Sequence, residues 1–357
     1  MSLRFTVVGA GHAGLAMAAH LSSMGYPVSL YNRGEERLVA LEETHGRVLI
    51  DGIIQEEVQI DRFGRDPEEA VEGADVVMVA IPATGHRDIA ELFAPFLKPG
   101  QIVILNPGRT CGALEFCNVL REREKEGVLV AETQTIIYTS RSHGRKSTIS
   151  TLKKHVEIAA LPSSATWAVL ERIKVVYPQF VAAPNVLHTS MGNVGMILHP
   201  LPIILNTGWI EFPEGNFFHY YDGISPSIAK VLEILDRERL AVSHAYGIKV
   251  SSTLEWLQMT YGVTGENLYE GLQRNKSYRI VSAPKTLHHR FMLEDVSTGL
   301  VPMICLGRIA GVETPIAEMG VQMASLLCGI DFWDTGRNAK RLGIEGLSRE
   351  AVKLLMS

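Results

Sequence analysis

The sequence predicts an α/β fold in which an N-terminal Rossmann-type, doubly wound parallel sheet precedes a mainly α-helical C-terminal domain. Three observations predict it. A glycine-rich turn at 9–14 lies between a short apolar segment and a helical one. Further apolar runs of strand length follow and end in proline or glycine, as is typical of parallel strands buried on both faces. After about Pro184 the apolar residues recur with helical spacing. We therefore expect one domain over 1–184 and a second over 185–357.

The first unit of the predicted sheet is a strand, a turn, a helix and a second strand. The apolar segment 4–8 predicts the first strand, 13–24 has helical periodicity, and 27–31 predicts the second strand. The turn between them reads G-x-G-x-x-G. In this context the motif predicts a dinucleotide-binding loop, whereas a lone match would be weak.

Each residue of the loop has a physical role in such a site. Gly9 permits the tight turn, Gly11 lets the backbone approach a pyrophosphate, and Gly14 lets the helix pack close to the strand. The helix begins near His12 and Ala13, so the amides there would face the phosphates, aided by the helix dipole. The alternative interpretation is a glycine turn that binds no ligand.

More strands follow along the chain. The runs 74–82, 101–108 and 128–133 predict buried strands, and 135–140 and 148–161 suggest extra β-structure, joined by a polar, basic loop over 139–147. Ligands of such sheets lie beyond the carboxyl ends of the strands. Candidates for the nicotinamide wall are therefore the residues at the ends of two runs: Ile81, Pro82, Ala83, Asn106, Pro107 and Gly108. Turn chemistry alone is the alternative reason for these residue types.

The second half of the chain predicts helices separated by short loops. They cover 185–199, 224–247, 252–262 and 313–329. Ser225-Pro226 and Thr314-Pro315 are typical of a capping residue followed by a first-turn proline. The apolar helix over 315–328 suits either the core or a subunit interface, so a homodimer is possible and the oligomeric state stays open.

Composition excludes several classes of protein. The 357 residues are 46% hydrophobic with a formal net charge of −5, and no basic face indicates nucleic-acid binding. The four cysteines lack metal-ligand spacing, which argues against a zinc site or disulfide framework and favours a reducing compartment such as the cytoplasm. The longest apolar run, around 194–210, is interrupted by polar residues and too short for a membrane span, and strand-like residues begin too early for a signal peptide.

The end of the second strand bears on the choice of dinucleotide. NAD-binding folds usually place Asp or Glu there, to bond the ribose 2′-OH. This chain has Asn32 and Arg33 instead. Asn32 offers a hydrogen bond and Arg33 suits a 2′-phosphate, so NADP is favoured over NAD. Two alternatives stay open: Arg33 is a solvated loop charge, or Glu35 bonds the ribose in a longer loop.

A histidine stands out in the second domain, within G-M-I-L-H-P-L-P-I-I-L-N at 195–206. A carbonyl or imine reductase needs a proton donor beside the carbon that accepts hydride. Histidine suits this role, especially when a carboxylate holds its other nitrogen. Pro200 should interrupt the helix at His199 and aim the ring out of the apolar face. A buried histidine bonded to a neighbouring carbonyl is the alternative.

Polar residues near His199 favour a site. His188 and Asn206 would share its helical face, and Asn193 lies nearby. A carboxylate partner would come from Glu294 or Asp295, which precede another apolar helical run. Asp295 suits either an N-cap or the partner of the histidine, and the sequence spacing does not decide between them.

Several of these stretches together resemble the opine dehydrogenases, especially the bacterial branch that makes N-(1-carboxyethyl) amino acids. The resemblance covers nearly the whole chain and is carried by GAGHAG, ADVVMVAIPATGH, ILNPGRTCGALEF, ETQTIIYTSR, NVLHTSMGNVGMILHPLPIILN and EDVSTGLVPMICLGRIAGVETP. It implies that His199, in the H-P motif, is the acid/base, and that Asp295, in the E-D-V-S-T-G-L-V-P motif, is its partner.

The resemblance also implies a reaction. An α-keto acid such as pyruvate condenses with the amine of an amino acid, and reduced NAD(P) delivers hydride to the resulting imine. Cationic or amide groups should hold the two substrate carboxylates. The candidates are Arg141, Arg290, Asn193 and Asn206. The chain departs from the family pattern at His12, where relatives often carry Asn, and at Asn32-Arg33, which replace an acidic residue.

Two other functions remain to be distinguished. A ketopantoate-type reductase or hydroxyacid dehydrogenase would act on a keto acid without amine, and we expect those enzymes to resemble this chain in the first domain only. The ketopantoate type uses a lysine as its acid, and 185–211 contains none. A non-catalytic, dinucleotide-sensing protein is the second alternative.

Overall fold

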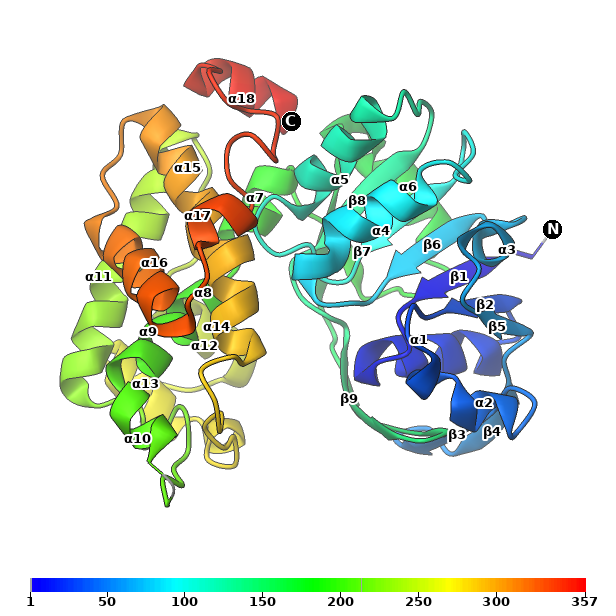
Figure 1. The fold of residues 1–357 in the computed structure, drawn as a ribbon, viewed down its shortest axis with the longest axis horizontal. Coiled ribbons are helices and arrows are strands. Elements are labelled where there is room, and N and C mark those ends of the chain that lie inside the picture. Colours follow the sequence, from blue (N-terminus) through cyan, green and yellow to red (C-terminus); the bar gives the residue numbers. More distant parts are fainter. Residues whose placement is uncertain (1, 213) are drawn as a thin grey trace. The chain divides into compact units, whose positions relative to one another are not determined.

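The computed structural model describes residues 2–212 and 214–357. The chain divides into two compact units, which we call the N-terminal unit (Met1–Thr189 with Met356–Ser357) and the C-terminal unit (Ser190–Leu355) (Figure 1). A boundary between independently folding domains at 184 stays a prediction.

The N-terminal unit is built on an eight-stranded sheet. Its strands, in spatial order, are β12 (Phe180–Ala182), β11 (Val156–Leu161), β8 (Leu129–Thr133), β7 (Ile102–Leu105), β6 (Val76–Val79), β1 (Phe5–Val8), β2 (Val28–Tyr31) and β5 (Arg62–Gly64). Neighbouring strands are parallel except β8 and β11, which are antiparallel. All four residues of β1, β6 and β7 are buried, so both faces of the sheet are covered, as the apolar runs predict.

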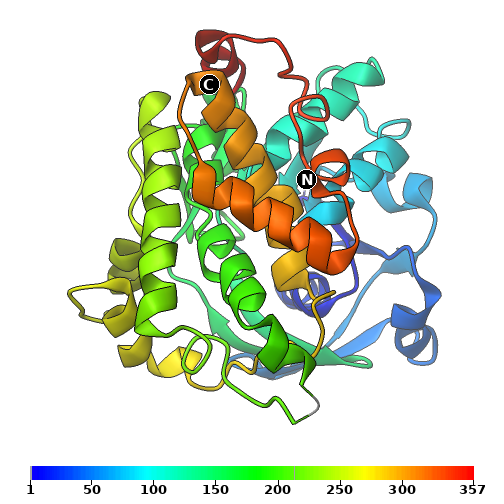
Figure 2. The ribbon, with the colours of Figure 1, turned by 60° about the vertical axis from the view of Figure 1, so that its left-hand side comes forward.

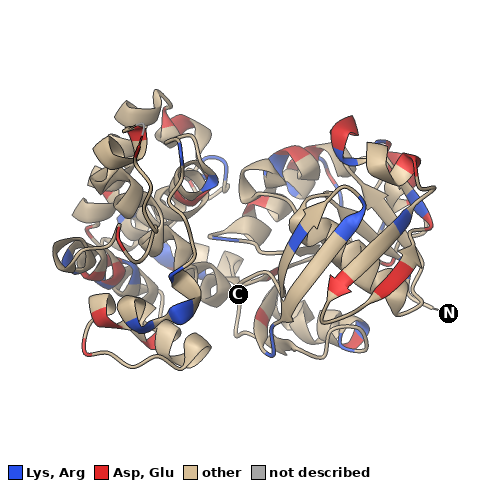
Figure 3. Cartoon of the chain, turned by 90° about the horizontal axis from the view of Figure 1, so that it is seen from below, with Lys and Arg blue, Asp and Glu red and all other residues tan. Residues whose placement is uncertain are grey.

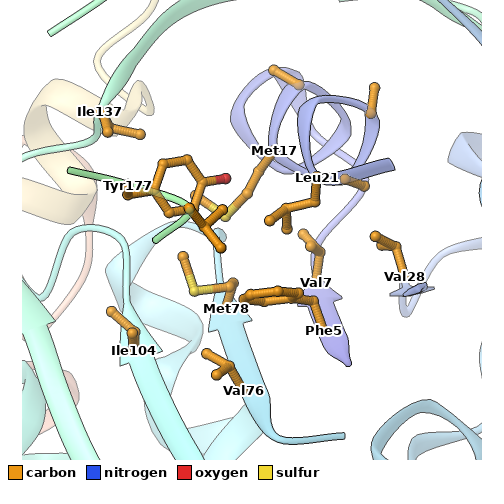
Figure 4. Close-up of a cluster of buried hydrophobic side chains, with 14 of the residues drawn as sticks. Phe5, Val7, Met17, Leu21, Val28, Val76, Met78, Ile104, Ile137 and Tyr177 are labelled. Atoms are coloured by element: carbon orange, nitrogen blue, oxygen red, sulfur yellow. The ribbon is translucent and has the colours of Figure 1, made fainter. Parts of the chain in front are cut away.

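Helix α1 (His12–Ser23) lies between this sheet and a second one. The second sheet has four strands, in the order β4 (Glu56–Gln59), β3 (Arg47–Gly52), β10 (Lys146–Leu152) and β9 (Tyr138–His143). Because α1 packs against strands of both sheets, every residue from Gly14 to Leu21 is buried. Figure 4 shows Met17 and Leu21 of α1 above Val7 and Met78 of the large sheet. A helix that is apolar on all sides is stable only in such a doubly covered position.

The polar loop predicted over 139–147 is wrong. Strands β9 and β10 form an antiparallel hairpin there, with Gly144 and Arg145 between them. Ser140 and Ser147 are buried in it, while Arg141 is exposed on β9. Over 139–147 the alternation is between small polar and charged residues rather than between apolar and polar ones, whereas the β-structure predicted on either side, over 135–140 and 148–161, is present in part of each stretch. The segment 139–147 therefore lacks the hydrophobic signal on which strand prediction depends.

Short helices connect the strands of the N-terminal unit. They are η1 (Glu35–Arg37), α2 (Val39–Glu42), α3 (Pro67–Val71), η2 (Ala83–Gly85), α4 (His86–Phe93), α5 (Gly112–Glu122), η3 (Ser163–Ala165), α6 (Thr166–Ile173) and α7 (Val186–Met191), the last of which ends in the C-terminal unit. The alternation of strands with helices gives the doubly wound arrangement predicted for this part of the chain.

The described residues of the C-terminal unit are mainly helical. The helices are α8 (Gly195–Leu198), α9 (Pro200–Leu205), α10 (Thr207–Glu211), α11 (Pro226–Ala245), α12 (Thr253–Tyr261), α13 (Leu268–Arg274), η4 (Lys276–Tyr278), α14 (Arg290–Asp295), η5 (Val296–Leu300), α15 (Val301–Ala310), α16 (Pro315–Cys328), α17 (Phe332–Thr335) and α18 (Arg349–Leu355). The long helix α11, yellow-green in Figure 2, packs against α8, α15 and α16. The site described below lies where α8, α9, α14 and η5 meet.

The two predicted helix caps have different outcomes. Ser225 caps α11 as expected, because its hydroxyl accepts a hydrogen bond from Ile228 N. Helix α16 begins at Pro315 as expected, but Thr314 makes no side-chain cap bond. Glu238 of α11 accepts from Ile316 N and Ala317 N at 2.8 and 3.0 Å instead. Folding thus brings the Glu238 carboxylate to the backbone amides at the start of α16, which Thr314 was expected to cap.

Acidic and basic residues lie interspersed over both units (Figure 3). Among the described residues, no helix has the length and apolarity needed to cross a membrane.

Candidate active site

The helix that carries His199 is interrupted at that residue, as the two following prolines predict. Helix α8 ends at Leu198 and α9 begins at Pro200. In a continuous helix the Leu198 carbonyl would accept from residue 202, but Pro202 has no N–H. His219 supplies the missing donor, with Nε2 3.1 Å from Leu198 O. Burial lowers the pKa of the His219 ring to about 3, so it stays neutral in this role.

Asp295 lies on a second helical segment, which contains a turn of π-helix and packs beside the first. Helix α14 continues through η5 into α15, so Asp295 lies inside a continuous helical segment and is fully buried. The interpretation of Asp295 as an N-cap is therefore wrong: the cap of α14 is His289, whose Nδ1 accepts from Phe291 N.

The imidazole of His199 and the carboxylate of Asp295 form a hydrogen bond. Nδ1 of His199 is 2.7 Å from Oδ2 of Asp295, and the two side chains are 12% and 0% exposed. A carboxylate accepts, so Nδ1 carries the hydrogen and Nε2 of the neutral ring is left as the acceptor. This arrangement fixes the tautomer and stabilises the imidazolium that proton uptake would create.

Close packing of the α8–α9 segment against the α14–η5 segment brings the pair together. Segment η5 is a turn of π-helix that precedes Pro302, whose ring cannot be accommodated against the carbonyl four residues back in a regular helix. A Cβ on Gly299 of η5 would lie 2.7 Å from Cβ of Met196 in α8. The absence of a side chain at Gly299 therefore lets α8 approach the helix that carries Asp295.

Aromatic side chains surround the imidazole, and the sequence reasoning missed them. Phe291 stacks on His199 with ring centroids 4.0 Å apart and planes at 8°. The hydroxyl of Tyr220 is 2.9 Å from Nε2 of His199. The signal that was available is the run F-F-H-Y-Y at 217–221, which concentrates aromatic rings and a histidine in a loop. Nothing in its spacing connects it with position 199.

The polar stripe expected along one helix face is wrong. Two breaks separate α7, α8 and α9, so the spacing of a single helix does not relate His188 and Asn206 to His199. His188 lies in the N-terminal unit and pairs with Glu157 at 3.3 Å. Asn206 lies at the junction of α9 and α10 and donates its amide hydrogens to Pro202 O and Gly223 O, at 2.7 and 2.8 Å.

The other substrate candidates lie in different surroundings. Asn193 is buried, and its side-chain oxygen accepts from Gly195 N at 3.1 Å. Arg290 is 60% exposed at the start of α14 and pairs with Glu294 at 3.7 Å. Arg141 is exposed in the N-terminal unit, where its guanidinium donates to the Ser140 carbonyl oxygen.

The glycine loop of the N-terminal unit has the geometry that its motif predicts. Gly9 adopts φ +108°, a backbone conformation that favours glycine. A Cβ on Gly14 would overlap the carbonyl oxygen of Gly9 and lie 2.8 Å from the carbonyl carbon of that residue, which accounts for the close helix–strand packing. A Cβ on Gly11 would meet nothing within 4 Å, so space beside this residue is available to a ligand.

Neighbouring side chains hold the loop in place. Oδ1 of Asn32 accepts from Ala10 N at 2.9 Å, and its Nδ2 donates to Gly34 O at 2.6 Å. His12 Nδ1 accepts from Ser142 N at 2.9 Å, so the hydrogen of the neutral ring is on Nε2. Strand β9, which the sequence predicted only as far as residue 140, thus orders the first residue of α1.

The charged residues after β2 form ion pairs in solvent. Arg33 lies 3.5 Å from Asp88, with side chains 78% and 65% exposed. Glu35, the alternative ribose ligand, lies 3.4 Å from Arg65. Exposed pairs of this kind contribute little to stability, so either side chain can exchange its partner at little cost.

The residues expected to form the nicotinamide wall follow the carboxyl ends of two central strands of the large sheet. Ile81, Pro82 and Ala83 follow β6, and Asn106, Pro107 and Gly108 follow β7, and these two strands are parallel neighbours. Asn106 is buried and its Nδ2 donates to Ile104 O at 2.8 Å, which gives it a structural contact in addition to any role towards a ligand.

The sequence reasoning missed a buried carboxylate beside Gly108 and a partly buried lysine elsewhere in the N-terminal unit. Glu132, the fourth residue of β8, is fully buried and accepts from Ala113 N and the Thr189 hydroxyl. Lys153 donates to the Thr135 hydroxyl at 2.7 Å, and burial, with a smaller contribution from the charge of Arg109, lowers its pKa to about 8. Within the described ranges, no group of three or more His, Cys, Asp or Glu side chains could hold a metal ion.

Comparison with known proteins identifies the family. Residues 182–328 match the α-helical domain of NAD/NADP octopine/nopaline dehydrogenase, and residues 4–108 match the N-terminus of NAD-dependent glycerol-3-phosphate dehydrogenase. An opine dehydrogenase of Arthrobacter sp. (strain 1C) is 38% identical over 356 residues, which is 99% of this chain and 98% of that protein.

The chain belongs to the opine dehydrogenase family. It is accordingly an NAD(P)-dependent dehydrogenase that acts on CH–NH donors, and its reaction is a reductive condensation in which hydride adds to an imine. The prediction of the family, the fold class and the reaction from the sequence is confirmed.

Solved structures extend the comparison to the fold. Octopine dehydrogenase with NADH and L-arginine superposes with a TM-score of 0.82 at 20% identity, covering 99% of this chain and 98% of that one. The same enzyme with NADH and pyruvate gives 0.79 at 19% identity over 98% of both chains.

One expectation about the alternative enzymes is wrong. A ketopantoate reductase from Ralstonia eutropha JMP134 covers 92% of this chain and 98% of its own, with a TM-score of 0.62 at 16% identity. The resemblance in fold therefore extends beyond the first domain.

Proposed function

We propose that His199 and Asp295 carry the proton transfers of a reductive condensation between an α-keto acid, such as pyruvate, and the amino group of an amino acid. The observation that supports this most directly is the 2.7 Å hydrogen bond between His199 Nδ1 and the fully buried carboxylate of Asp295. Pairing with a carboxylate stabilises the imidazolium, so the ring can take up a proton and return it.

Each proton transfer has a place in the reaction. The amino group of the amino acid must lose a proton as it adds to the keto carbon, and the hydroxyl of the resulting carbinolamine must gain one to leave as water. His199 accepts the first proton and supplies the second, while Asp295 holds the ring orientation through both steps. The reduced nicotinamide, when bound, supplies hydride to the imine carbon.

The residues of the N-terminal unit fit a dinucleotide. The space beside Gly11 would receive the pyrophosphate, and the Nε2–H of His12 is a suitable donor to a phosphate oxygen. We propose that Ala13 and the residues after β6 and β7 complete this site.

We propose NADP as the favoured form of the cofactor. The guanidinium of Arg33 is exposed, and its ion pair with Asp88 is long, at 3.5 Å, and therefore weak. A 2′-phosphate could take the place of Asp88 as the partner of Arg33. The side chain of Asn32 already accepts a hydrogen bond from Ala10 N and donates one to Gly34 O. Its role would therefore be to position the loop beside the adenosine ribose.

Arg290 is the substrate-carboxylate ligand that the geometry supports best. It begins the helix that carries Asp295, and its guanidinium lies 6.0 Å from the ring of Phe291, which stacks on His199. Asn193 and Arg141 remain further candidates. Asn206 already gives its amide hydrogens to two backbone carbonyls, so any contact with substrate would use its carbonyl oxygen.

A matrix of keto acids against amino acids, with NADPH oxidation followed by absorbance, tests the function. Oxidation should require both substrates, and pyruvate should be among the keto acids used, as in the octopine dehydrogenase structure that holds it. Full-rate reduction of a keto acid without any amine would instead support a ketopantoate-type or hydroxyacid dehydrogenase activity. Cofactor binding with no turnover in the whole matrix would support a dinucleotide sensor.

The role of His199 is tested by His199→Asn. The variant should lose about 10²–10⁴ in turnover, the usual contribution of acid–base catalysis. Its affinity for NADPH, measured by fluorescence titration, should stay that of the parent, since the glycine loop belongs to the N-terminal unit. Unchanged turnover would contradict the assignment.

We also infer a reducing compartment such as the cytoplasm, because all four cysteines are thiols and three of them are buried. A homodimer stays a prediction, which sedimentation of the purified protein tests.

A further inference from the structure

Both nitrogens of the His199 ring already have hydrogen-bond partners. Nδ1 contacts Asp295 at 2.7 Å, and Nε2 contacts the hydroxyl of Tyr220 at 2.9 Å. An imidazole nitrogen makes one hydrogen bond in the plane of the ring. A substrate therefore exchanges a proton with His199 either through the Tyr220 hydroxyl or after that hydroxyl has moved away.

The backbone around Tyr220 holds this side chain in place. Phe217 O accepts from Ala283 N at 2.9 Å, and His219 N donates to Val281 O at 2.8 Å, which pins the segment to 281–283. The side chain of Asp222 accepts from Phe218 N at 2.7 Å and closes the turn.

Side chains add to the restraint. The neighbouring ring of His219 is bonded to the Leu198 carbonyl that the prolines leave without a helical donor. The ring of Tyr220 is 5% exposed and stacks on Tyr278, with centroids 4.1 Å apart. Moving the Tyr220 hydroxyl off Nε2 would disturb these contacts, whereas passing a proton through it would disturb none.

We propose that Tyr220 is a catalytic residue that relays the proton between His199 and the substrate. This rests on the proposed role of His199 as the acid/base. In the neutral ring, Tyr220 O–H donates to Nε2. In the imidazolium, Nε2–H donates to Tyr220 Oη, and the hydroxyl passes its own hydrogen to a substrate atom.

The step balances without a free phenolate. As water leaves the carbinolamine, the C–O bond breaks with its electron pair on oxygen, and the nitrogen lone pair forms the C=N bond. The departing oxygen takes the Tyr220 hydroxyl proton, and Tyr220 takes the Nε2 proton of the His199 imidazolium in the same step. The ring returns to the neutral tautomer held by Asp295. The reverse transfers activate water when the imine is hydrolysed.

Tyr220→Phe removes the hydroxyl and keeps the ring that stacks on Tyr278. The relay predicts that kcat falls by about 10²–10⁴, the range for lost acid–base catalysis. It also predicts that combining Tyr220→Phe with His199→Asn causes little further loss, because the two groups act in series. Tyr278→Phe is the matched control: it removes a buried hydroxyl from the stacked neighbour and should leave kcat near that of the parent.

A fluorinated tyrosine at position 220 supplies a readout that a structural role would not move. It preserves the shape and the hydrogen bond but makes the hydroxyl a stronger donor to neutral Nε2, which disfavours protonation of the ring, so the pH profile of kcat should shift to lower pH. This variant also keeps the proposal testable if Tyr220→Phe does not fold.

Two results would overturn the relay. One is a Tyr220→Phe protein with parental or higher kcat, which would make Tyr220 a group that substrate displaces. The other is a pH profile that fluorination leaves unchanged. If His199→Asn itself retains full turnover, the proposed function fails instead, and the two failures are thereby distinguished.

Discussion

The glycine loop of the N-terminal unit and the histidine site of the C-terminal unit are built in opposite ways. The loop comes from consecutive residues, 9–14, and depends on backbone space at Gly9 and Gly14. The histidine site joins side chains from α8–α9, α14 and the 217–223 loop, and it depends on hydrogen bonds between distant residues. The loop should therefore be sensitive to any added volume, whereas the site should be sensitive to the polarity of single atoms even when volume is conserved.

The largest effect expected is that of Gly14→Ala. The added Cβ would overlap the Gly9 carbonyl oxygen, so the strand and helix must separate, at a cost of about 3 kcal/mol or more in the free energy of unfolding. Urea unfolding of the full chain measures this. Gly11→Ala is the control, because a Cβ there meets nothing within 4 Å. The free energy of unfolding of Gly11→Ala should equal that of the parent, and only its affinity for the cofactor should fall. Equal destabilisation by both variants would contradict the packing argument.

Asp295→Asn tests the other side of the comparison, since it changes polarity at nearly constant volume. The amide neither balances an imidazolium nor favours the Nδ1–H tautomer, so kcat should fall by about 10²–10⁴. Steady-state kinetics with a parallel NADPH titration would show the loss in turnover alone. Glu294→Gln removes the adjacent carboxylate, which faces Arg290 at 3.7 Å rather than His199, and should cost far less. Similar losses of kcat from the two variants would contradict a specific role for the pair of Asp295 with His199.

His219→Gln should alter how stability depends on pH. Burial depresses the pKa of native His219 from 6.5 to about 3, so between these values the unfolded chain binds a proton that the native protein does not. This group therefore lowers the free energy of unfolding as pH falls below 6.5, by up to about 1.4 kcal/mol per pH unit. Glutamine can still donate to Leu198 O but does not titrate. Urea unfolding at pH 7 and pH 5 should show a shallower decline for the variant; equal declines would rule out this coupling.

The smallest effect expected is at the edge of the cofactor site. Arg33→Ala should weaken NADPH binding by about tenfold or more, since charge-assisted hydrogen bonds contribute about 1.5–3 kcal/mol, and should leave NADH binding unchanged. Asp88→Ala removes the competing partner of Arg33 and should bind NADPH at least as well as the parent. A parent protein with the same affinity for both cofactors would remove the case for a phosphate contact.

The success of sequence reasoning follows the same division. The strand, turn and helix at the N-terminus and the helix break at His199 are confirmed, because each depends on neighbours in the chain: glycines at fixed spacing, and a proline after the histidine. The polar loop over 139–147 and the Thr314 cap are wrong, because strand pairing and a carboxylate from α11 decided those positions. The aromatic run at 217–221 contains Tyr220, but neither Tyr220 nor Phe291 carries a signal that connects it with position 199, since their importance arises only from the ring they contact.

By itself, the sequence determined the glycine loop, the central strands of the large sheet, the mainly helical second half, the interruption at His199 and, through its resemblance, the family. Local sterics and hydrophobic periodicity act over a few residues, and so they can be read along the chain. Only the tertiary structure decided that Asp295 lies inside a helix against the imidazole, that Gly299 admits the approach of α8, and that a tyrosine occupies the remaining ring nitrogen. Those contacts join residues far apart in the sequence, and a hydrogen bond exists only where folding brings a donor within reach of an acceptor.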